Sequence, residues 1–162
     1  MTVPDSIVKE TVLRAPLSRV WQAIGDAAQF GHWFGVRFDG PFVAGQSLYG
    51  TMQPTTVDPA MAAMQEPFRG TGFTIDVVEV EEMRRLAFRW HPGPPGAGGE
   101  AEPTTLVTFE LSAVEDGTRL RITESGFDRI PLARRAEAFT GNEGGWEHQL
   151  RLVATYLERH AA

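Results

Sequence analysis

The sequence contains no cysteine and a single lysine, Lys9. The absence of cysteine excludes disulfides, thiolate nucleophiles and cysteine-based metal sites. Because the one lysine lies near the start of a predicted strand, Schiff-base chemistry and a phosphate-binding P-loop are both disfavoured. No two histidines have the spacing of a metal site, so we expect neither a metal nor another cofactor.

Positive charge and long apolar runs are also scarce. Lys and Arg total 15 against 21 Asp and Glu, a formal net charge of −6, which disfavours nucleic acid as a partner. No apolar run approaches the roughly 20 residues that cross a bilayer, so we expect no membrane association. Residues 1–6 lack the basic region and apolar core of a secretory signal, and the expected location is therefore the cytoplasm.

The rest of the composition is that of an ordinary globular protein, with 42% hydrophobic and 22% charged residues. A chain of 162 residues is long enough to bury about 68 to 70% of the surface that its unfolded form exposes. We find no internal repeat and no domain boundary. The sequence therefore predicts a single domain over residues 1–162.

The first 35 residues predict a strand followed by two short helices. Residues 7–13 alternate between apolar and polar types, as expected of a strand. Pro16 introduces a helix whose apolar positions recur at helical spacing as far as Gly25. Asp26, with Gln29 three residues later, has the form of a capping box for a second helix that ends at Gly35.

The middle of the chain predicts strands, interrupted by one long connection. The connection at residues 53–67 contains three prolines and is either a lid or a plain surface insertion. Its Met61 and Met64 either cover a cavity or face solvent. An Asp-Gly turn at residues 115–117 joins the clearest hairpin. Strands are predicted at residues 36–38, 47–52, 71–81, 85–91 and 106–114 and after the turn, with an irregular loop at residues 92–103.

The last part of the chain predicts a long amphipathic helix. Within residues 144–160, an apolar stripe at helical spacing faces away from a charged side. Residues 132–139 predict a separate helical piece that is interrupted at Gly141, and a single bent helix fits nearly as well. The stripe consists of Trp146, Leu150, Val153 and Leu157.

The order of these elements, taken with short motifs inside them, resembles the activator of heat shock protein 90 ATPase homologue family of the START-like, polyketide-cyclase (SRPBCC) superfamily. The resemblance extends from about residue 7 to residue 157. It rests on Ala15-Pro16, Val20-Trp21, Trp33-Phe34-Gly35, Gly45, the segments 78–80 and 85–90, Gly117-Thr118 before Leu120, and Gly145-Trp146 with Leu150 and Leu157.

The resemblance implies an α+β protein with a helix-grip fold. In this fold, a curved antiparallel β-sheet of six to seven strands wraps around a long C-terminal helix, with two short helices after the first strand. Members of the superfamily bind lipids, sterols, polyketides or hormones in an elongated apolar cavity, and some catalyse cyclisation or hydrolysis. The eukaryotic namesake assists a chaperone ATPase and also uses a separate N-terminal domain, for which 162 residues leave no room.

The aromatic residues are the strongest indication of a binding site. Large rings at inward-facing positions either fill a core or line a concave pocket. Combined with the implied fold, they predict a ligand cavity between the sheet and the final helix. The predicted ligand-binding residues are Trp33, Phe34, Phe73, Phe88, Trp90, Phe109, Glu124, Phe127, Trp146 and Leu150.

Two ionisable residues are candidates for catalysis. Strand alternation places Glu124 on the same face as Leu120 and Ile122, where a buried carboxylate can act as a general acid or base or anchor a ligand. The alternative is that the strand ends earlier and Glu124 pairs with an arginine such as Arg89 or Arg121. His91 ends an aromatic strand, although alternation points it away from Trp90. No nucleophile elbow or phosphate loop is found.

The sequence thus predicts a START-like protein that binds a small hydrophobic or amphipathic ligand. One alternative is an enzyme of the cyclase, dehydratase or hydrolase kind that uses Glu124 or His91. Another is a module that associates with a chaperone or another protein partner. Homodimerisation through exposed strand edges is a further expectation for partners.

Overall fold

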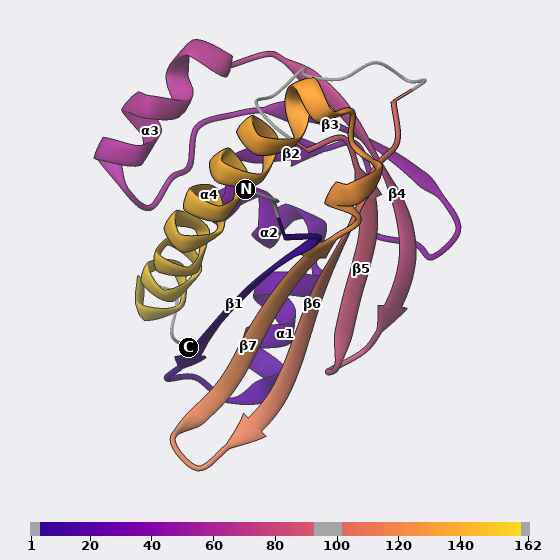
Figure 1. Cartoon of the computed structure of the whole chain (residues 1–162). Helices are drawn as coiled ribbons and strands as arrows, with labels where there is room; N and C mark the ends of the chain where they lie inside the picture. Colours follow the sequence, from indigo (N-terminus) through magenta and orange to yellow (C-terminus); the bar gives the residue numbers. More distant parts are fainter. Residues whose placement is uncertain (1–3, 93–101, 160–162) are drawn as a thin grey trace.

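The computed structural model describes residues 4–92 and 102–159. Seven strands form one antiparallel sheet, and a long C-terminal helix lies across one of its faces (Figure 1). The strand order is β1-β7-β6-β5-β4-β3-β2, which leaves β1 and β2 at the two edges. This is the helix-grip architecture that the resemblance implied.

The elements between the N-terminus and the insertion match the predicted order. Strand β1 (Ser6–Leu13) is followed by helices α1 (Leu17–Gly25) and α2 (Ala27–Phe34) and then by β2 (Val36–Phe38) and β3 (Ser47–Met52). The Asp26 side chain caps α2 by accepting hydrogen bonds from the backbone N–H groups of Ala28 and Gln29. The capping box is only half formed, because Gln29 Oε1 instead accepts from Arg19 and Tyr156.

The insertion folds into helix α3 (Pro59–Gln65) and one 3₁₀ turn, η1 (Glu66–Phe68). The side chain of Asp58 caps α3 by accepting from two backbone N–H groups, and Pro59 occupies the first helical position. Met61 is partly buried against the core, whereas Met64 is 62% exposed. Of the two methionines, only Met61 therefore packs on the interior.

The remaining strands build the centre of the sheet. They are β4 (Gly72–Glu81), β5 (Arg85–Trp90), β6 (Thr105–Val114) and β7 (Gly117–Ser125), followed by the 3₁₀ turn η2 (Phe127–Arg129). A bulge between Val77 and Glu79 shifts the register of β4 against β5, and bulges bend the strands that carry them. Of the irregular loop predicted at residues 92–103, residues 93–101 lie outside the described residues.

The C-terminal helix α4 (Leu132–Arg159) is continuous over 28 residues. The predicted interruption at Gly141 is wrong, and the alternative of a single helix is correct. Three glycines lie within it at positions where an added Cβ atom would meet nothing within 4 Å: Gly141, Gly144 and Gly145. Helix propensity disfavours glycine, but α4 buries Ala138 before these glycines and Trp146 after them, and this packing keeps the helix intact.

The core lies between the sheet and the helices α1, α2 and α4. Edge strand β1 contributes Ile7 and Leu13 to it, and Lys9 lies between them on the same face. The Lys9 ammonium contacts Glu147 Oε1 on α4 at 2.8 Å, and this hydrogen bond raises the pKa of Lys9. An ion pair thus joins the edge of the sheet to the long helix.

Candidate functional site

A buried carboxylate lies at the centre of the apolar interior. Glu124, near the end of β7, is fully buried, as are Leu120 and Ile122 on the same face. The strand continues to Ser125 and does not end before Glu124. Arg121, one of the two arginines considered as partners, instead donates to Glu10 at 2.8 Å.

Four neutral side chains donate hydrogen bonds to the Glu124 carboxylate. Oε1 accepts from Trp146 Nε1 at 2.9 Å and from Asn142 Nδ2 at 2.8 Å. Oε2 accepts from Trp90 Nε1 at 2.8 Å and from the Thr105 hydroxyl at 2.5 Å, with Asn142 at 3.0 Å. Indole and amide N–H groups can only donate, so this set suits a carboxylate, which only accepts.

The two tryptophans bound to Glu124 also stack on each other. Their ring centroids are 5.6 Å apart and their planes are inclined by 24°. Trp90 comes from β5 and Trp146 from α4, so the pair bridges the sheet and the helix. Four phenylalanine rings surround the pair at centroid distances of 5.4 to 6.4 Å: Phe34, Phe73, Phe88 and Phe109.

Part of the aromatic interior is accessible from the surface. Phe73 and Trp90 are only partly buried, and so is Leu150, which follows Trp146 by one helical turn. In contrast, Trp146 is 2% exposed and Phe88 1%. The partly buried rings therefore continue the buried cluster towards solvent.

Two of the predicted binding residues lie outside the first layer of rings around the tryptophan pair, although Trp33 packs against Phe34 with centroids 5.7 Å apart. The Trp33 indole donates to the carbonyl of Ala23 at 2.9 Å and fixes α2 against α1. Phe127, in η2, packs edge-on against Phe139 of α4 with centroids 5.1 Å apart. Both side chains are fully buried, and their contacts are those of structural core residues.

His91 belongs to a different polar group at the end of β5. Its Nε2 atom lies 2.9 Å from the carbonyl oxygen of Glu102. The Glu102 carboxylate is paired with Arg134 at the start of α4, whose guanidinium also donates to the carbonyl of Pro92 at 3.1 Å. The Arg134 hydrogen bond holds the pKa of Glu102 below its ordinary value of 4.5. The interaction fastens the start of α4 to the segment after β5.

A junction of three helices lies beside the aromatic cluster, at the C-terminus of α2. The carbonyl of Phe34 accepts hydrogen bonds from Gln65 Nε2 of α3 and Gln149 Nε2 of α4, both at 3.2 Å. Gln65 Oε1 in turn accepts from the backbone N–H of Thr55 at 2.7 Å. Gly35 ends α2 with a φ of 102°, and an added Cβ atom would lie 2.7 Å from Gln65 Oε1. The insertion is thus attached to α2 through Gln65.

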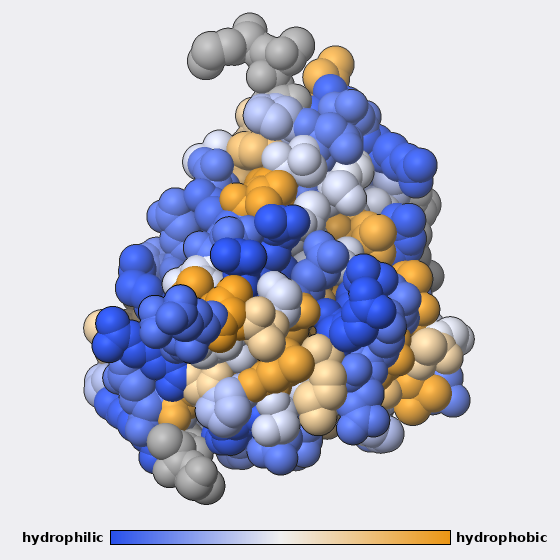
Figure 2. Space-filling view, turned by 90° about the horizontal axis from the view of Figure 1, so that it is seen from below, coloured by the Kyte–Doolittle hydropathy of each residue, from blue (hydrophilic) through white to orange (hydrophobic). Residues whose placement is uncertain are grey.

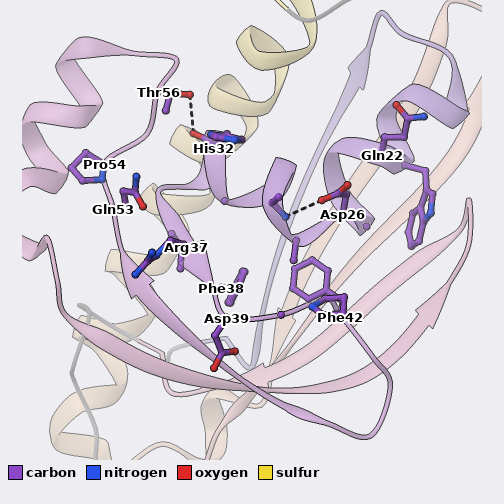
Figure 3. Close-up of a pocket in the computed structure, with 18 of the residues that line it drawn as sticks. Gln22, Asp26, His32, Arg37, Phe38, Asp39, Phe42, Gln53, Pro54 and Thr56 are labelled. Carbon is purple, nitrogen blue, oxygen red and sulfur yellow. Dashed lines mark hydrogen bonds between the residues drawn. The ribbon is translucent and has the colours of Figure 1, made fainter.

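A hollow of about 1020 Å³ lies elsewhere, between the turn that joins α1 to α2 and strand β2. Figure 3 shows Gln22 and Asp26 on one side of it and Arg37 and Asp39 on the other. None of the predicted binding residues lines it. The Asp26 carboxylate is already engaged as the cap of α2. We therefore place the candidate site at the aromatic interior, where the buried carboxylate lies, and not at this hollow.

Sequence reasoning missed three polar residues of the interior. Asn142 precedes Trp146 by four positions and shares its helix face, a relationship that the predicted break at Gly141 concealed. Thr105 alternates with Val107 and Phe109 on the inner face of β6 and could have been found by starting that strand one residue earlier. Gln149 gave no signal beyond its position beside Leu150.

Two further properties of the described part of the chain bear on function. Across residues 4–92 and 102–159, no three His, Asp or Glu side chains are grouped so as to hold a metal ion. In the same ranges, no helix has the length and apolar character needed to span a bilayer.

The model of one protein family matches residues 14–158, which is most of the chain. Its description is activator of Hsp90 ATPase homolog 1-like protein. The chain belongs to this family, as the resemblance indicated. No curated protein matches the chain.

Solved structures share the fold over nearly the whole chain. Protein MLL2253 from Mesorhizobium loti is 22% identical with a TM-score of 0.70, and the match covers 96% of this chain and 98% of that one. A Bordetella parapertussis protein is 26% identical with a TM-score of 0.66, covering 96% and 76%. DynU16, described as a putative protein in the dynemicin biosynthetic locus, is 26% identical with a TM-score of 0.68, covering 96% and 48%.

Proposed function

We propose that this protein binds a small hydrophobic or amphipathic molecule between the sheet and α4, against the stacked rings of Trp90 and Trp146. The observation that carries the proposal is the fully buried Glu124, which accepts hydrogen bonds from both indoles. Family membership supports it, since the superfamily is one of ligand-binding and cyclase-like proteins. The location in the cytoplasm stays a prediction from the sequence.

Burying a carboxylate in an apolar core is unfavourable in free energy. Removing the charge from water costs free energy that hydrogen bonds only partly return, and apolar replacements of buried ionic groups are often neutral or stabilising. Glu124 does, however, fix the orientation of two large rings from different elements. Rings that are held in place before a ligand arrives lose less entropy on binding. The free-energy cost of burying Glu124, together with its effect on the orientation of the two rings, favours a role in ligand binding.

The same hydrogen bonds argue for binding over catalysis by Glu124. A general base needs an oxygen lone pair directed at the substrate proton. A carboxylate has about four such positions, and here four side chains donate to them. Proton abstraction would require one of these donors to leave. The enzyme alternative therefore depends on a rearrangement of the site, whereas ligand binding does not.

Association with a protein partner is the other alternative. Large hydrophobic side chains that are exposed include Phe68 in η1, Leu132 at the start of α4 and Val8 in β1. Figure 2 views the molecule from below and shows several hydrophobic patches with hydrophilic residues between them. The face shown lacks the large continuous patch that is typical of a docking surface. Ligand binding remains the better-supported function.

The proposal is tested by equilibrium dialysis with 2-naphthol, a small amphipathic aromatic probe. We expect saturable binding that is weakened about tenfold or more in Trp146→Ala, since an aromatic contact and its buried area are lost. Leu157→Ala, a change in the same helix three turns further on, should lower stability by about 2 to 5 kcal/mol but leave the affinity unchanged. Trp90→Leu provides a second variant at a partly exposed ring.

Circular dichroism verifies that each variant is folded under the conditions of the binding assay. The absence of saturable binding to the wild-type protein contradicts the proposal. So does an equal loss of affinity in Trp146→Ala and Leu157→Ala, because the effect would then reflect stability alone. Native mass spectrometry of the purified protein complements the assay by detecting a small molecule that co-purifies.

A further inference from the structure

We propose that Gln149 is a specificity-determining residue of this site and that its Oε1 atom accepts a hydrogen bond from a hydroxyl or N–H group of the bound molecule. The inference rests on the proposed function and adds a chemical requirement to it. The ligand is then an apolar molecule that carries at least one hydrogen-bond donor.

The side-chain amide of Gln149 is only half paired. Its Nε2 atom donates to the carbonyl of Phe34 at 3.2 Å. Its Oε1 atom is buried and has no hydrogen-bond donor among the residues that the structure describes. Leaving a buried acceptor unpaired is unfavourable, and native proteins rarely do so without a reason.

The orientation of the amide follows from its neighbours. Rotating the group by half a turn would place Oε1 against the Phe34 carbonyl, where two acceptors would face each other. The carbonyl therefore holds Nε2 towards itself and directs Oε1 away. The unpaired atom is an acceptor, and its complement is a donor.

Gln65 provides an internal comparison, because it contacts the same carbonyl. Its Nε2 atom donates to Phe34 and its Oε1 atom accepts from Thr55, so both ends are paired. Gln65 already satisfies the Phe34 carbonyl, and Gln149 is not needed for that purpose. Gln65 thus uses both ends of its amide in structural contacts, whereas Gln149 keeps one acceptor that pairs with no described residue.

The position of Gln149 connects it to the aromatic site. It follows Trp146 by three residues on α4, and residues three apart are neighbours on a helix surface. The ring of Phe34 packs against Trp146 at 6.0 Å and against Trp90 at 6.2 Å. Four protein side chains already donate to the Glu124 carboxylate, so Gln149 Oε1, one helical turn from Trp146, is an acceptor that is left for a ligand donor.

The experiment compares two probes of similar shape, 2-naphthol and 2-methylnaphthalene, which differ in carrying a hydroxyl or a methyl group. Dissociation constants are measured for the wild-type protein, Gln149→Met and Gln65→Met. We expect the preference for 2-naphthol over 2-methylnaphthalene to fall about tenfold in Gln149→Met, the size of one net hydrogen bond. Gln65→Met should keep the wild-type preference.

Thermal unfolding of the same variants separates recognition from structure. Gln149→Met should melt at the same temperature as the wild-type protein or higher, because it removes an unpaired buried acceptor and Gln65 still satisfies the Phe34 carbonyl. Gln65→Met should melt at a lower temperature, because it leaves the N–H of Thr55 without its partner. If Gln149 has a structural role instead, Gln149→Met should melt at a lower temperature than the wild-type protein.

The outcomes distinguish this inference from the function on which it rests. If both probes bind and Trp146→Ala weakens both, but Gln149→Met keeps the wild-type preference, the role of Gln149 is overturned and the proposed function stands. If neither probe binds the wild-type protein, the proposed function fails and this inference fails with it. A tenfold loss of preference with unchanged melting supports both.

Discussion

The indole rings of Trp90 and Trp146 are stacked at 5.6 Å, although one belongs to a central strand and the other to the C-terminal helix. Each indole N–H donates to a different oxygen of the same carboxylate, that of Glu124. The stacking and the shared acceptor fix the distance between β5 and α4 at this level. Polar contacts and ring stacking together therefore set the spacing of the sheet and the helix at this point.

Glu124→Gln should destabilise the protein. Either orientation of the new amide directs its NH₂ group at an indole N–H, so at least one donor of Trp90 or Trp146 loses its acceptor. We expect a loss of about 1 to 3 kcal/mol in the free energy of unfolding, measured in urea. Glu115→Gln, at an exposed turn, serves as the control and should change little. Equal stability of Glu124→Gln and the wild-type protein would show that these hydrogen bonds do not hold the site.

Because of Glu102, the free energy of unfolding should vary with pH in the acid range. Pairing with Arg134 lowers the pKa of Glu102 in the folded state below its ordinary value of 4.5. Its ionised form therefore stabilises the folded state above pH 4.5, and this contribution is lost as the pH falls through the folded-state pKa.

The measurement compares wild type with Glu102→Gln by urea unfolding from pH 7 to pH 3. The variant should be less stable at pH 7, and the difference should shrink below pH 4.5. Glu66→Gln is the control, because the Glu66–Arg69 pair is exposed and such pairs contribute little. A difference between wild type and Glu102→Gln that does not vary with pH would contradict the assignment.

Gly35→Ala should loosen the attachment of the insertion. The backbone φ of 102° disfavours any side chain, and the new methyl group would meet Gln65 at 2.7 Å. Gly45→Ala is a matched control, since its φ is 86° and its Cβ atom would meet nothing within 4 Å. We expect about 1 to 2 kcal/mol of strain at Gly45 and a larger loss at Gly35. Faster proteolysis within residues 53–71 should accompany the change at Gly35 only.

Alanine at the three glycines of α4 should stabilise the protein. Gly141→Ala, Gly144→Ala and Gly145→Ala place a methyl group in open space and reduce the conformational freedom of the unfolded chain. Each should add about 0.4 to 1 kcal/mol to the free energy of unfolding. Gly31→Ala provides the opposite case, because its Cβ atom would lie 2.1 Å from the carbonyl oxygen of Val36. Destabilisation by all three helix substitutions would mean that α4 requires glycine there.

The elements that could be predicted from sequence are those whose signals lie in neighbouring residues. Helix α1 was predicted to end at Gly25, as it does, because the apolar spacing and the stop signal lie in adjacent residues. The inward direction of Glu124 followed from alternation along β7. The continuity of α4 was not predictable in the same way, since it depends on the burial of Ala138 and Trp146, and Trp146 packs against rings of β5 and β6 that are distant in the chain.

The candidate site was harder to predict, because its contacts join residues that are far apart in the chain. Alternation indicated which face Trp90 and Glu124 occupy, but not that their side chains meet. Trp33 and Phe127 face the core as predicted, yet Trp33 reaches the tryptophan pair through Phe34, and Phe127 packs against Phe139. Asn142 and Gln149 are polar residues on a helix that faces the core, and only the structure shows where their amides point.

The ion pair between Lys9 and Glu147 makes the one lysine side chain of the protein a slow nucleophile at neutral pH. Lys9 is the only lysine, and its ammonium is engaged by α4 at the edge of the sheet. Reagents that acylate amines therefore have one lysine side chain as a target, and at neutral pH they react faster with a free α-amino group, whose ordinary pKa is about 8. At alkaline pH and with the α-amino group blocked, a dye or surface coupled to Lys9 would attach every molecule at the same point, which turns an edge-strand residue into a defined attachment point for single-molecule work.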